Sequence, residues 1–263
     1  MSPSDEQLLA AARAGDGRAM EQLLARHEPS VYRFGLRMCG NEDDAREVLQ
    51  ETLLATFKNL ASFRGDSKLS TWLYQVARSF CTKQRRRHEG EPAEHAALED
   101  VEARRVVSDS TGPDARTHAR QVGEVIQAAL ATLPIEQREA IVLRDVEGLS
   151  TEEAADVVGI EVYALKSRLH RARMSLKQSL AAVLDDDGTE LGCEGLRQEL
   201  SSYAASEIDQ AACAHIEEHL QTCAQCSAAC ESLKRTVSMC RSIPGGEVPV
   251  TVRTAVRRAL LRH

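Results

Sequence analysis

The sequence is poor in aromatic residues and in long apolar runs. Aromatic side chains make up 3% of its 263 residues, and Trp72 is the single tryptophan. No apolar stretch approaches the roughly 20 residues that a membrane-spanning helix needs, and the N-terminus, MSPSDEQLLA, has no apolar signal-peptide core. Alternating β-type patterns are scarce as well. These absences argue against membrane, secreted and sheet-based proteins, and they predict a cytoplasmic location.

Apolar residues recur instead at helical spacing, which predicts an all-α fold. The length allows two or three small domains. We divide the chain into a first helical block (5–88), a polar linker (89–118), a second helical block (119–184) and a Cys-rich block (185–263). The linker holds two prolines and has no sustained apolar stripe.

The net charge of −7 is unevenly distributed along the chain. Every charged residue from Lys166 to Lys177 is basic, whereas residues 185–249 hold 12 acidic and 4 basic side chains. We therefore expect a basic helix on which the acidic block can dock. No nucleophile–base pair with local support and no P-loop is present, so we predict that the protein is not an enzyme.

Residues 133–180 carry the start and stop signals of a helix-turn-helix unit. Pro134 suits the first turn of one helix. Ser150 and Glu153 form a capping box at the start of a short second helix. A long basic helix follows at about residues 162–182. A short helix, a turn and a basic helix are typical of a DNA reader, although a basic face that merely contacts solvent is the alternative.

The stretch ALATLPIEQREAIVLRDVEGLSTEEAADVVGIEVYALKSRLHRARMSL resembles region 4 of extracytoplasmic-function (ECF) sigma factors. The resemblance implies that the basic helix reads the −35 promoter element in the major groove, where cationic and hydroxyl side chains can meet base edges and phosphates. The residues implied in base reading are Lys166, Ser167, His170 and Arg171, with Arg168 and Arg173 near phosphates.

The segment DDAREVLQETLLATFKNLASFRGDSKLSTWLYQVARSFCTKQRRR resembles region 2 of the same family. Its first helix would dock on the β′ coiled coil of RNA polymerase through Asp44, Gln50 and Glu51; an ordinary acidic helix face is the alternative. The following loop and helix would hold a flipped base of the −10 element, which needs a mobile loop and cations. The −10 residues implied are Arg64, Trp72, Arg78 and Lys83, and Trp72 has the alternative role of a core anchor.

Six of the eight cysteines lie in the last block. In a reducing compartment such cysteines favour metal binding or redox switching over structural disulfides. His219, Cys223 and Cys226 form an H-x3-C-x2-C unit, and Cys193 would complete a tetrahedral set suited to Zn²⁺. Additional thiols extend the candidate ions to Cd²⁺ and Cu(I). The further candidate ligands are Cys213, His215, Cys230 and Cys240. The alternative for Cys213 or Cys240 is a small buried hydrophobic residue, and for His215 a surface position.

The runs CEGLRQELSSYAASEID and HIEEHLQTCAQC resemble the zinc-binding anti-sigma fold. Regions 2 and 4 followed by a Cys-rich tail look like the CorE-like metal-responsive sigma factors. That resemblance implies a C-terminal domain that senses zinc, cadmium or copper and controls promoter binding in cis. The implied partners are promoter DNA and the RNA polymerase core, through its β′ coiled coil and β flap, with no membrane and no separate anti-sigma factor.

Two alternatives for the Cys-rich block stay open. A thiol redox switch would pair Cys223 with Cys226 and expel zinc. A purely structural zinc domain would instead bind another regulator. The basic tail after Pro249 is expected to pack on the acidic block or to add a phosphate contact. Cys39 and Cys81 lie in the first helical block, where we expect core positions.

Overall fold

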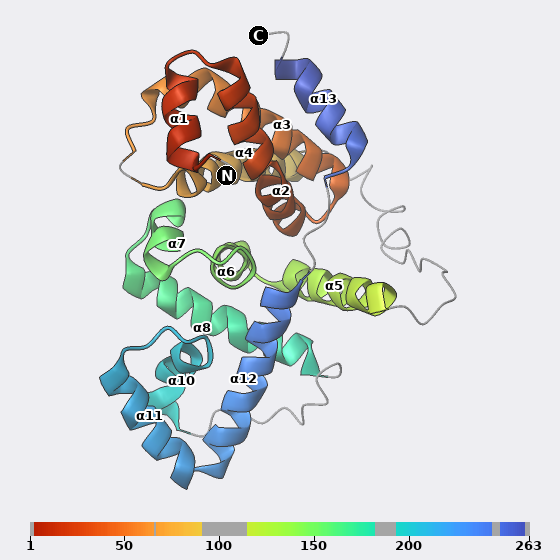
Figure 1. The fold of residues 1–263 in the computed structure, drawn as a ribbon. Coiled ribbons are helices and arrows are strands. Elements are labelled where there is room, and N and C mark those ends of the chain that lie inside the picture. The colour runs from red at the N-terminus through yellow and green to blue at the C-terminus, as the bar shows by residue number, and fades with distance from the viewer. Residues whose placement is uncertain (1–2, 66, 91–114, 182–192, 244–247, 261–263) are drawn as a thin grey trace, which may run out of the picture.

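The computed structural model describes residues 3–65, 67–90, 115–181, 193–243 and 248–260. Within these ranges every regular element is a helix, which confirms the all-α prediction (Figure 1). The helices form three successive groups, and a last helix returns to the first group. None of the described helices combines the length and the apolarity that crossing a bilayer requires.

The first group is a four-helix bundle whose helix starts are set by side-chain caps. Ser4 and Gln7 form a capping box at the first helix, Asp16 caps the second and Asn41 caps the third. Gly40 ends the second helix at a φ of 83°, which glycine adopts without steric cost. The helices are α1 (Asp5–Arg13), α2 (Gly17–Cys39), α3 (Glu42–Asn59) and α4 (Leu69–Gly90), with a 3-10 turn at Leu60–Ser62.

The second group contains the predicted helix-turn-helix unit. Pro134 precedes its first helix, which widens into a π-type turn, and the capping box of Ser150 and Glu153 is present. The long basic helix ends at Ser179, slightly before the predicted end. The elements are α5 (Ala115–Thr132), α6 (Ile135–Ile141), the π-type turn Val142–Val146, α7 (Thr151–Val158) and α8 (Val162–Ser179).

The third group has a small apolar core of its own, which contains Leu200, Ile216 and Leu233. Cys226 and Cys230 are part of this core. We call residues 193–243 the C-terminal block. Its elements are a 3-10 turn at Glu194–Leu196, α10 (Arg197–Ala204), α11 (Gln210–Thr222) and α12 (Ala224–Ser242).

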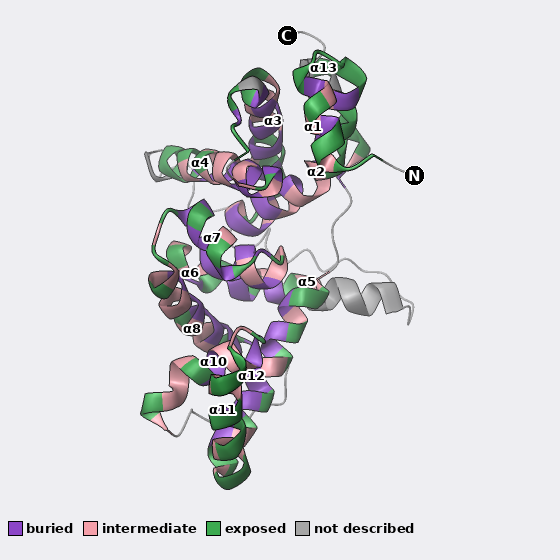
Figure 2. Cartoon of the chain, turned by 60° about the vertical axis from the view of Figure 1, so that its left-hand side comes forward, coloured by how far each residue is buried: buried purple, intermediate pink, exposed green. Residues whose placement is uncertain are grey.

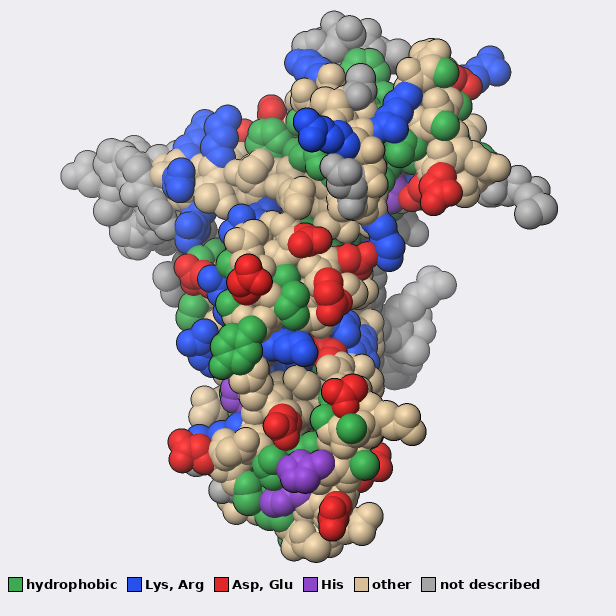
Figure 3. All heavy atoms as spheres, turned by 90° about the vertical axis from the view of Figure 1, so that its left-hand side faces the viewer, with side chains coloured by type: hydrophobic (Ala, Val, Ile, Leu, Met, Phe, Trp, Pro, Cys, Tyr) green, Lys and Arg blue, Asp and Glu red, His purple; other side chains and the backbone are tan. Residues whose placement is uncertain are grey.

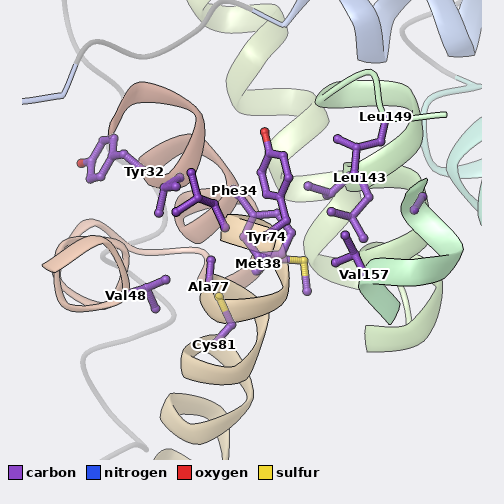
Figure 4. Close-up of a cluster of buried hydrophobic side chains, with 14 of the residues drawn as sticks. Tyr32, Phe34, Met38, Val48, Tyr74, Ala77, Cys81, Leu143, Leu149 and Val157 are labelled. Carbon is purple, nitrogen blue, oxygen red and sulfur yellow. The ribbon is translucent and has the colours of Figure 1, made fainter. Parts of the chain in front are cut away.

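A single apolar core runs through the first two groups. Tyr74 on α4 meets the ring of Phe34 edge-on, with the centroids 5.4 Å apart. Leu143, Leu149 and Val157 from the second group lie on the other side of Tyr74 (Figure 4). The first two groups are therefore held against each other by shared apolar contacts.

The basic tail forms α13 (Val250–Leu260), which packs on α3 of the first group (Figure 1). Val248 and Val252 are buried there and join the core of the first two groups. This corrects our expectation that the tail packs on the acidic block; its phosphate contact stays a prediction. The physical reason is its apolar face, because the buried Val252 side chain removes apolar surface from water.

The segment between α4 and α5 is shorter at both ends than the predicted linker, residues 89–118. Helix α4 continues to Gly90, and α5 already begins at Ala115. The rest of the predicted linker, residues 91–114, lies outside the described residues. Of the two cysteines expected in the core of the first block, Cys81 is buried and Cys39 is half-buried.

Candidate metal centre and nucleic-acid interface

Four side chains of the C-terminal block converge on one point. Cys193 comes from the segment before α10, His219 from the last turn of α11, Cys223 from the junction of α11 and α12, and Cys226 from the first turn of α12. Their ligand atoms all lie within 4.8 Å of one another. Cys223 makes the convergence possible because it ends one helix and starts the next, with its N–H donating to the His219 carbonyl over 2.9 Å. We call these four residues the Cys/His site.

The chemistry of the Cys/His site fits a thiophilic cation. His219 Nε2 is buried and has no hydrogen-bond partner within the described part of the chain, which is costly for a polar atom unless a ligand satisfies it. Hydrogen bonds from the Cys226 backbone N–H and thiol lower the pKa of Cys223, which favours its thiolate. A hydrogen bond with Cys226 raises the pKa of Cys193. Three sulfurs and one imidazole nitrogen match a tetrahedral zinc set.

The four additional candidates are not brought to the Cys/His site. On α11 the Cys213 thiol lies 3.4 Å from a Glu217 carboxylate oxygen, and His215 Nδ1 lies 3.9 Å from Glu199. Cys230 is buried in the core of the C-terminal block and Cys240 in the larger core. Burial raises the pKa of both of these thiols, which disfavours their thiolates. In this arrangement Cys230 and Cys240 are core cysteines.

The basic helix α8 presents most of its predicted reading residues on one side. Leu165, Leu169 and Leu176 are buried in the core, as its apolar stripe predicts. Arg171 is exposed. The other predicted base readers and Arg168 are half-buried: Lys166, Ser167, Arg168 and His170.

Arg173 is a correction to the predicted interface. Its guanidinium is buried and donates to both Asp145 carboxylate oxygens over 2.8 Å. It also donates to Glu207 of the C-terminal block over 2.6 Å, and to the Ser201 carbonyl over 3.2 Å. Two carboxylates that satisfy a buried guanidinium leave no room for a phosphate, so in this arrangement Arg173 is a structural residue rather than a DNA contact.

Glu207 joins the C-terminal block to the helix-turn-helix unit. Besides Arg173 it lies 3.0 Å from Arg144 Nε, and its own side chain is 2% exposed. Helices α10 and α12 pack along α8 (Figure 2). Sequence reasoning missed Glu207, because the acidic character of the block predicts docking but not which carboxylate performs it. It also missed Asp145 of the second group, whose contact with Arg173 joins residues 28 positions apart. Figure 3 shows one side of the molecule. On that side, Lys and Arg side chains lie across the middle, above histidines of the C-terminal block.

His170 is affected by this docking. Its Nδ1 atom is buried without a hydrogen-bond partner among the described residues. Burial lowers the pKa of His170, and three arginines act in the same direction, of which Arg197 belongs to α10 of the C-terminal block. These surroundings favour the neutral form of the imidazole.

The predicted −10 residues lie on the loop before α4 and on α4 itself. Arg64 and Lys83 are exposed, and Gly65 turns the loop with a φ of 86°. Trp72 is half-buried and packs on Phe63 with a centroid distance of 5.3 Å, so it also supports the core. Arg64 and Lys83 are therefore accessible from solvent, and Trp72 is partly accessible.

Arg78 has a different position from the other −10 candidates. It forms a two-pronged ion pair with Glu139 of α6, at 3.0 and 3.2 Å. Nearby, Glu147 accepts a hydrogen bond from Tyr74 over 2.9 Å and pairs with Arg33 over 3.1 Å. These carboxylates of the second group hold the cations of the first group at the seam between them.

The predicted polymerase-docking helix is α3. Its Asp44 interacts with Asn41 over 2.7 Å and with His88 of α4 over 3.1 Å. Gln50 and Glu51 are half-buried. Helix α13 packs on the same helix, and its Arg253 lies 3.8 Å from Glu28 of α2. The tail therefore occupies part of the surface around α3.

Comparison with known proteins matches two stretches of the chain. The family model "Sigma-70 region 2" matches residues 23–91, and "Sigma-70, region 4" matches residues 123–176. The first match spans most of α2 through α4, and the second spans most of α5 through α8. Residues 193–260, with the Cys/His site and α13, lie outside both matches.

Whole relatives agree with these matches. The chain is 34% identical to the "ECF RNA polymerase sigma factor SigE" of Mycolicibacterium smegmatis, over 69% of this chain and 71% of that protein. It is 36% identical to the "ECF RNA polymerase sigma factor SigM" of Mycobacterium tuberculosis, over 67% of this chain and 85% of that protein. A solved structure of the sigma factor RpoE in complex with the anti-sigma factor NepR, from Bartonella quintana, is 28% identical, covers 61% of this chain and 95% of that chain, and has a TM-score of 0.49. The chain belongs to the ECF RNA polymerase sigma factors.

Proposed function

We propose that this ECF sigma factor is regulated in cis by a thiophilic metal ion bound at the Cys/His site. Sigma factors bind the RNA polymerase core and promoter DNA to initiate transcription. The observation that carries the proposal is that the four ligands converge in the same block that docks on the promoter-reading helix. The fold supplies a restraint within the chain, so we propose that no separate anti-sigma factor is required.

A bound ion would be held by Cys193, His219, Cys223 and Cys226. It would supply bonds that tie the segment before α10 to the turn between α11 and α12. Zinc suits this ligand set best, and cadmium or Cu(I) would compete because thiolates prefer soft ions. Metal binding of this kind contributes directly to the folding of small domains.

The ordering of the C-terminal block is coupled to α8 through α10. Cys193 lies directly before the turn that leads into α10, and Glu207 follows the end of α10. Glu207 is the residue that reaches Arg173 and Arg144. An ion at Cys193 would therefore fix the start of the segment 193–207, and Glu207 at its end contacts the helix-turn-helix unit.

Metal binding favours the docked arrangement in this proposal. The ligands are already assembled while the block lies on α8, so an ion selects this arrangement over an open one. In the docked arrangement His170 is half-buried, and α13 covers part of α3. Both the reading helix and the polymerase-docking helix are then restrained in one state. Loss of the ion would release the C-terminal block from the reading helix, whereas α13 would keep its own contact with α3.

The test is transcription from a cognate promoter with purified protein and core polymerase, under reducing conditions. Zn²⁺, Cd²⁺ and copper in both oxidation states are titrated. We expect saturating zinc to lower activity about ten-fold, which corresponds to a shift of roughly 1.4 kcal/mol in the docking equilibrium. Cys223→Ser abolishes the response, whereas Cys213→Ser, on the same block but outside the site, retains it.

The other outcomes are informative as well. Activity that stays flat for every ion, in protein shown to contain metal, contradicts metal control and favours a structural zinc. A response to oxidant but not to metal favours the thiol switch of Cys223 and Cys226. Activation by an ion, lost in Cys223→Ser, keeps the Cys/His site as the sensor but contradicts the proposed direction.

A further inference from the structure

A second pair of cysteines lies far from the Cys/His site, inside the region 2 bundle. Cys39 is the last residue of α2, and Cys81 lies in the middle of α4. Their Sγ atoms are 3.8 Å apart, although the residues are 42 positions apart in the sequence. Figure 4 shows Cys81 beside Ala77 on α4, within the core of the first group. Both are free thiols.

We propose that Cys39 and Cys81 form a reversible disulfide when the protein meets a hydroperoxide. Two thiols on neighbouring helices already lie in contact, and their sulfurs must close from 3.8 Å to a bonding distance of about 2.05 Å. The two residues also differ in access: Cys39 is half-buried, whereas Cys81 is 7% exposed. A small oxidant therefore reaches Cys39 first.

The reaction needs one hydroperoxide molecule as oxidant. The Cys39 thiolate attacks the terminal peroxide oxygen and the O–O bond breaks. The leaving oxyanion takes up a proton and becomes an alcohol, or water where the oxidant is hydrogen peroxide. Cys39 is now a sulfenic acid. The Cys81 sulfur attacks the Cys39 sulfur, the S–S bond forms, and the S–O bond breaks with release of water. Two thiols are oxidised and one peroxide is reduced.

Both reactive positions adjoin the seam between the two sigma domains. Arg138 of α6 donates to the Met38 carbonyl, next to Cys39, over 3.0 Å. Glu139, the next residue on α6, pairs with Arg78, which lies one turn before Cys81 on α4. A bridge between α2 and α4 would fix the two points that hold α6. We infer that oxidation strengthens the closed arrangement of the two domains.

The pair is chemically independent of the Cys/His site. All four residues of that site belong to the C-terminal block, whereas the pair belongs to the domain that matches the region 2 model. A hydrogen bond with Cys39, followed by burial, raises the pKa of Cys81, which makes it the weaker nucleophile toward the oxidant. Such a partner suits the resolving step rather than the first attack on the oxidant.

The test uses the full chain, reduced and loaded with zinc, and treated with hydrogen peroxide. Remaining thiols are alkylated, and the digested protein is searched by mass spectrometry for a peptide pair that links Cys39 to Cys81. We expect this link to form, and dithiothreitol to remove it. In Cys81→Ser the link is absent, and a dimedone adduct appears at Cys39 instead. In Cys39→Ser, Cys81 stays alkylatable at the same peroxide dose.

Several outcomes would overturn the inference. One such outcome is that Cys39 and Cys81 both stay fully alkylatable at a peroxide dose that oxidises the C-terminal cysteines. Another is that Cys39 forms its disulfide with a second molecule instead of with Cys81. Circular dichroism of both variants shows whether they are folded, and the wild-type mapping does not depend on them.

Function is read in the same samples. Transcription by the bridged protein should fall about five-fold, a shift of roughly 1 kcal/mol, and should recover with dithiothreitol. The fall should be absent in Cys39→Ser. If the Cys39–Cys81 disulfide forms but transcription does not change, the disulfide does not strengthen the closed arrangement of the two sigma domains. Zinc release measured in parallel keeps this result separate from failure of the metal proposal.

Discussion

Arg171 and Arg173 lie two positions apart on α8, but their surroundings give them opposite roles. Arg171 is exposed, whereas Arg173 is 1% exposed between Asp145 and Glu207. Loss of an exposed cation that meets DNA weakens binding without changing the fold. Loss of a cation that neutralises two buried carboxylates leaves those carboxylates unpaired, which is costly.

We therefore expect Arg171→Ala and Arg173→Ala to fail in different assays. Arg171→Ala should weaken promoter binding by about 1–3 kcal/mol, with an unchanged unfolding midpoint and unchanged metal content. Arg173→Ala should lower the stability of the second helix group by about 3–5 kcal/mol. Fluorescence anisotropy with promoter DNA and chemical denaturation separate the two effects. Equal promoter affinity of Arg171→Ala and wild type would refute its role as a reader.

His170 provides a second prediction at the residue scale, concerning pH. Burial in the docked arrangement lowers the pKa of His170 below its ordinary value of about 6.5. The open form therefore binds more protons than the docked form in acid. Docking is at full strength above about pH 6.5 and weakens as the pH falls below that value, toward the lowered pKa of the docked form.

The measurement is the docked fraction as a function of pH, followed by a fluorophore pair on the C-terminal block and on α7. His170→Asn removes the titrating group at similar size and serves as the control. Protonation of the metal ligands also opens the protein in acid, and that contribution is common to both proteins. The wild type should open at a higher pH than His170→Asn. Superimposable curves would show that this imidazole does not control docking.

At the scale of elements, α13 is the clearest case of a helix whose role depends on where it packs. Val252 is 1% exposed against the first helix group, whereas Val250, two positions earlier, is 76% exposed. The two positions form a matched pair on one helix. A charge at the buried position breaks the packing, and the same charge at the exposed position does not.

We expect Val252→Asp to detach α13 from α3 and to raise the affinity for core polymerase about ten-fold, since burial of one apolar side chain is worth roughly 1.5–3 kcal/mol. Val250→Asp should bind polymerase like the wild type. Affinity is measured by fluorescence anisotropy with labelled sigma factor and unlabelled core enzyme. If both variants bind like the wild type, α13 does not compete with polymerase for this surface.

Elements whose signals are local could be predicted from the sequence. The capping box of Ser150 and Glu153 spans three residues, and the H-x3-C-x2-C unit spans one turn between two helices, so both can be recognised in a short window. The docking of Glu207 on Arg173 joins residues 34 positions apart. The packing of α13 on α3 depends on tertiary contacts that no local pattern encodes. The Cys39–Cys81 contact was missed for the same reason, because each cysteine alone has the pattern of a core residue.

The whole molecule combines two restraints that converge on the sigma domains. The C-terminal block lies on α8, and α13 lies on α3 at the opposite end of the molecule (Figure 1). The block and α13 are joined in sequence through the end of α12, where Cys240 enters the larger core. Release of the block from α8 would therefore leave α13 on α3 as a separate contact with the first group.

Removal of the metal should consequently open the molecule in stages. A chelator is expected to unfold the C-terminal block, because its small core relies on the four ligands. The first two helix groups should stay folded, since their shared core does not include those ligands. Limited proteolysis would then cut first within residues 193–243, and α13 would be lost from the sigma domains only in Val252→Asp. Simultaneous loss of all helical signal by circular dichroism would show that the sigma domains depend on the metal site, which the separate cores argue against.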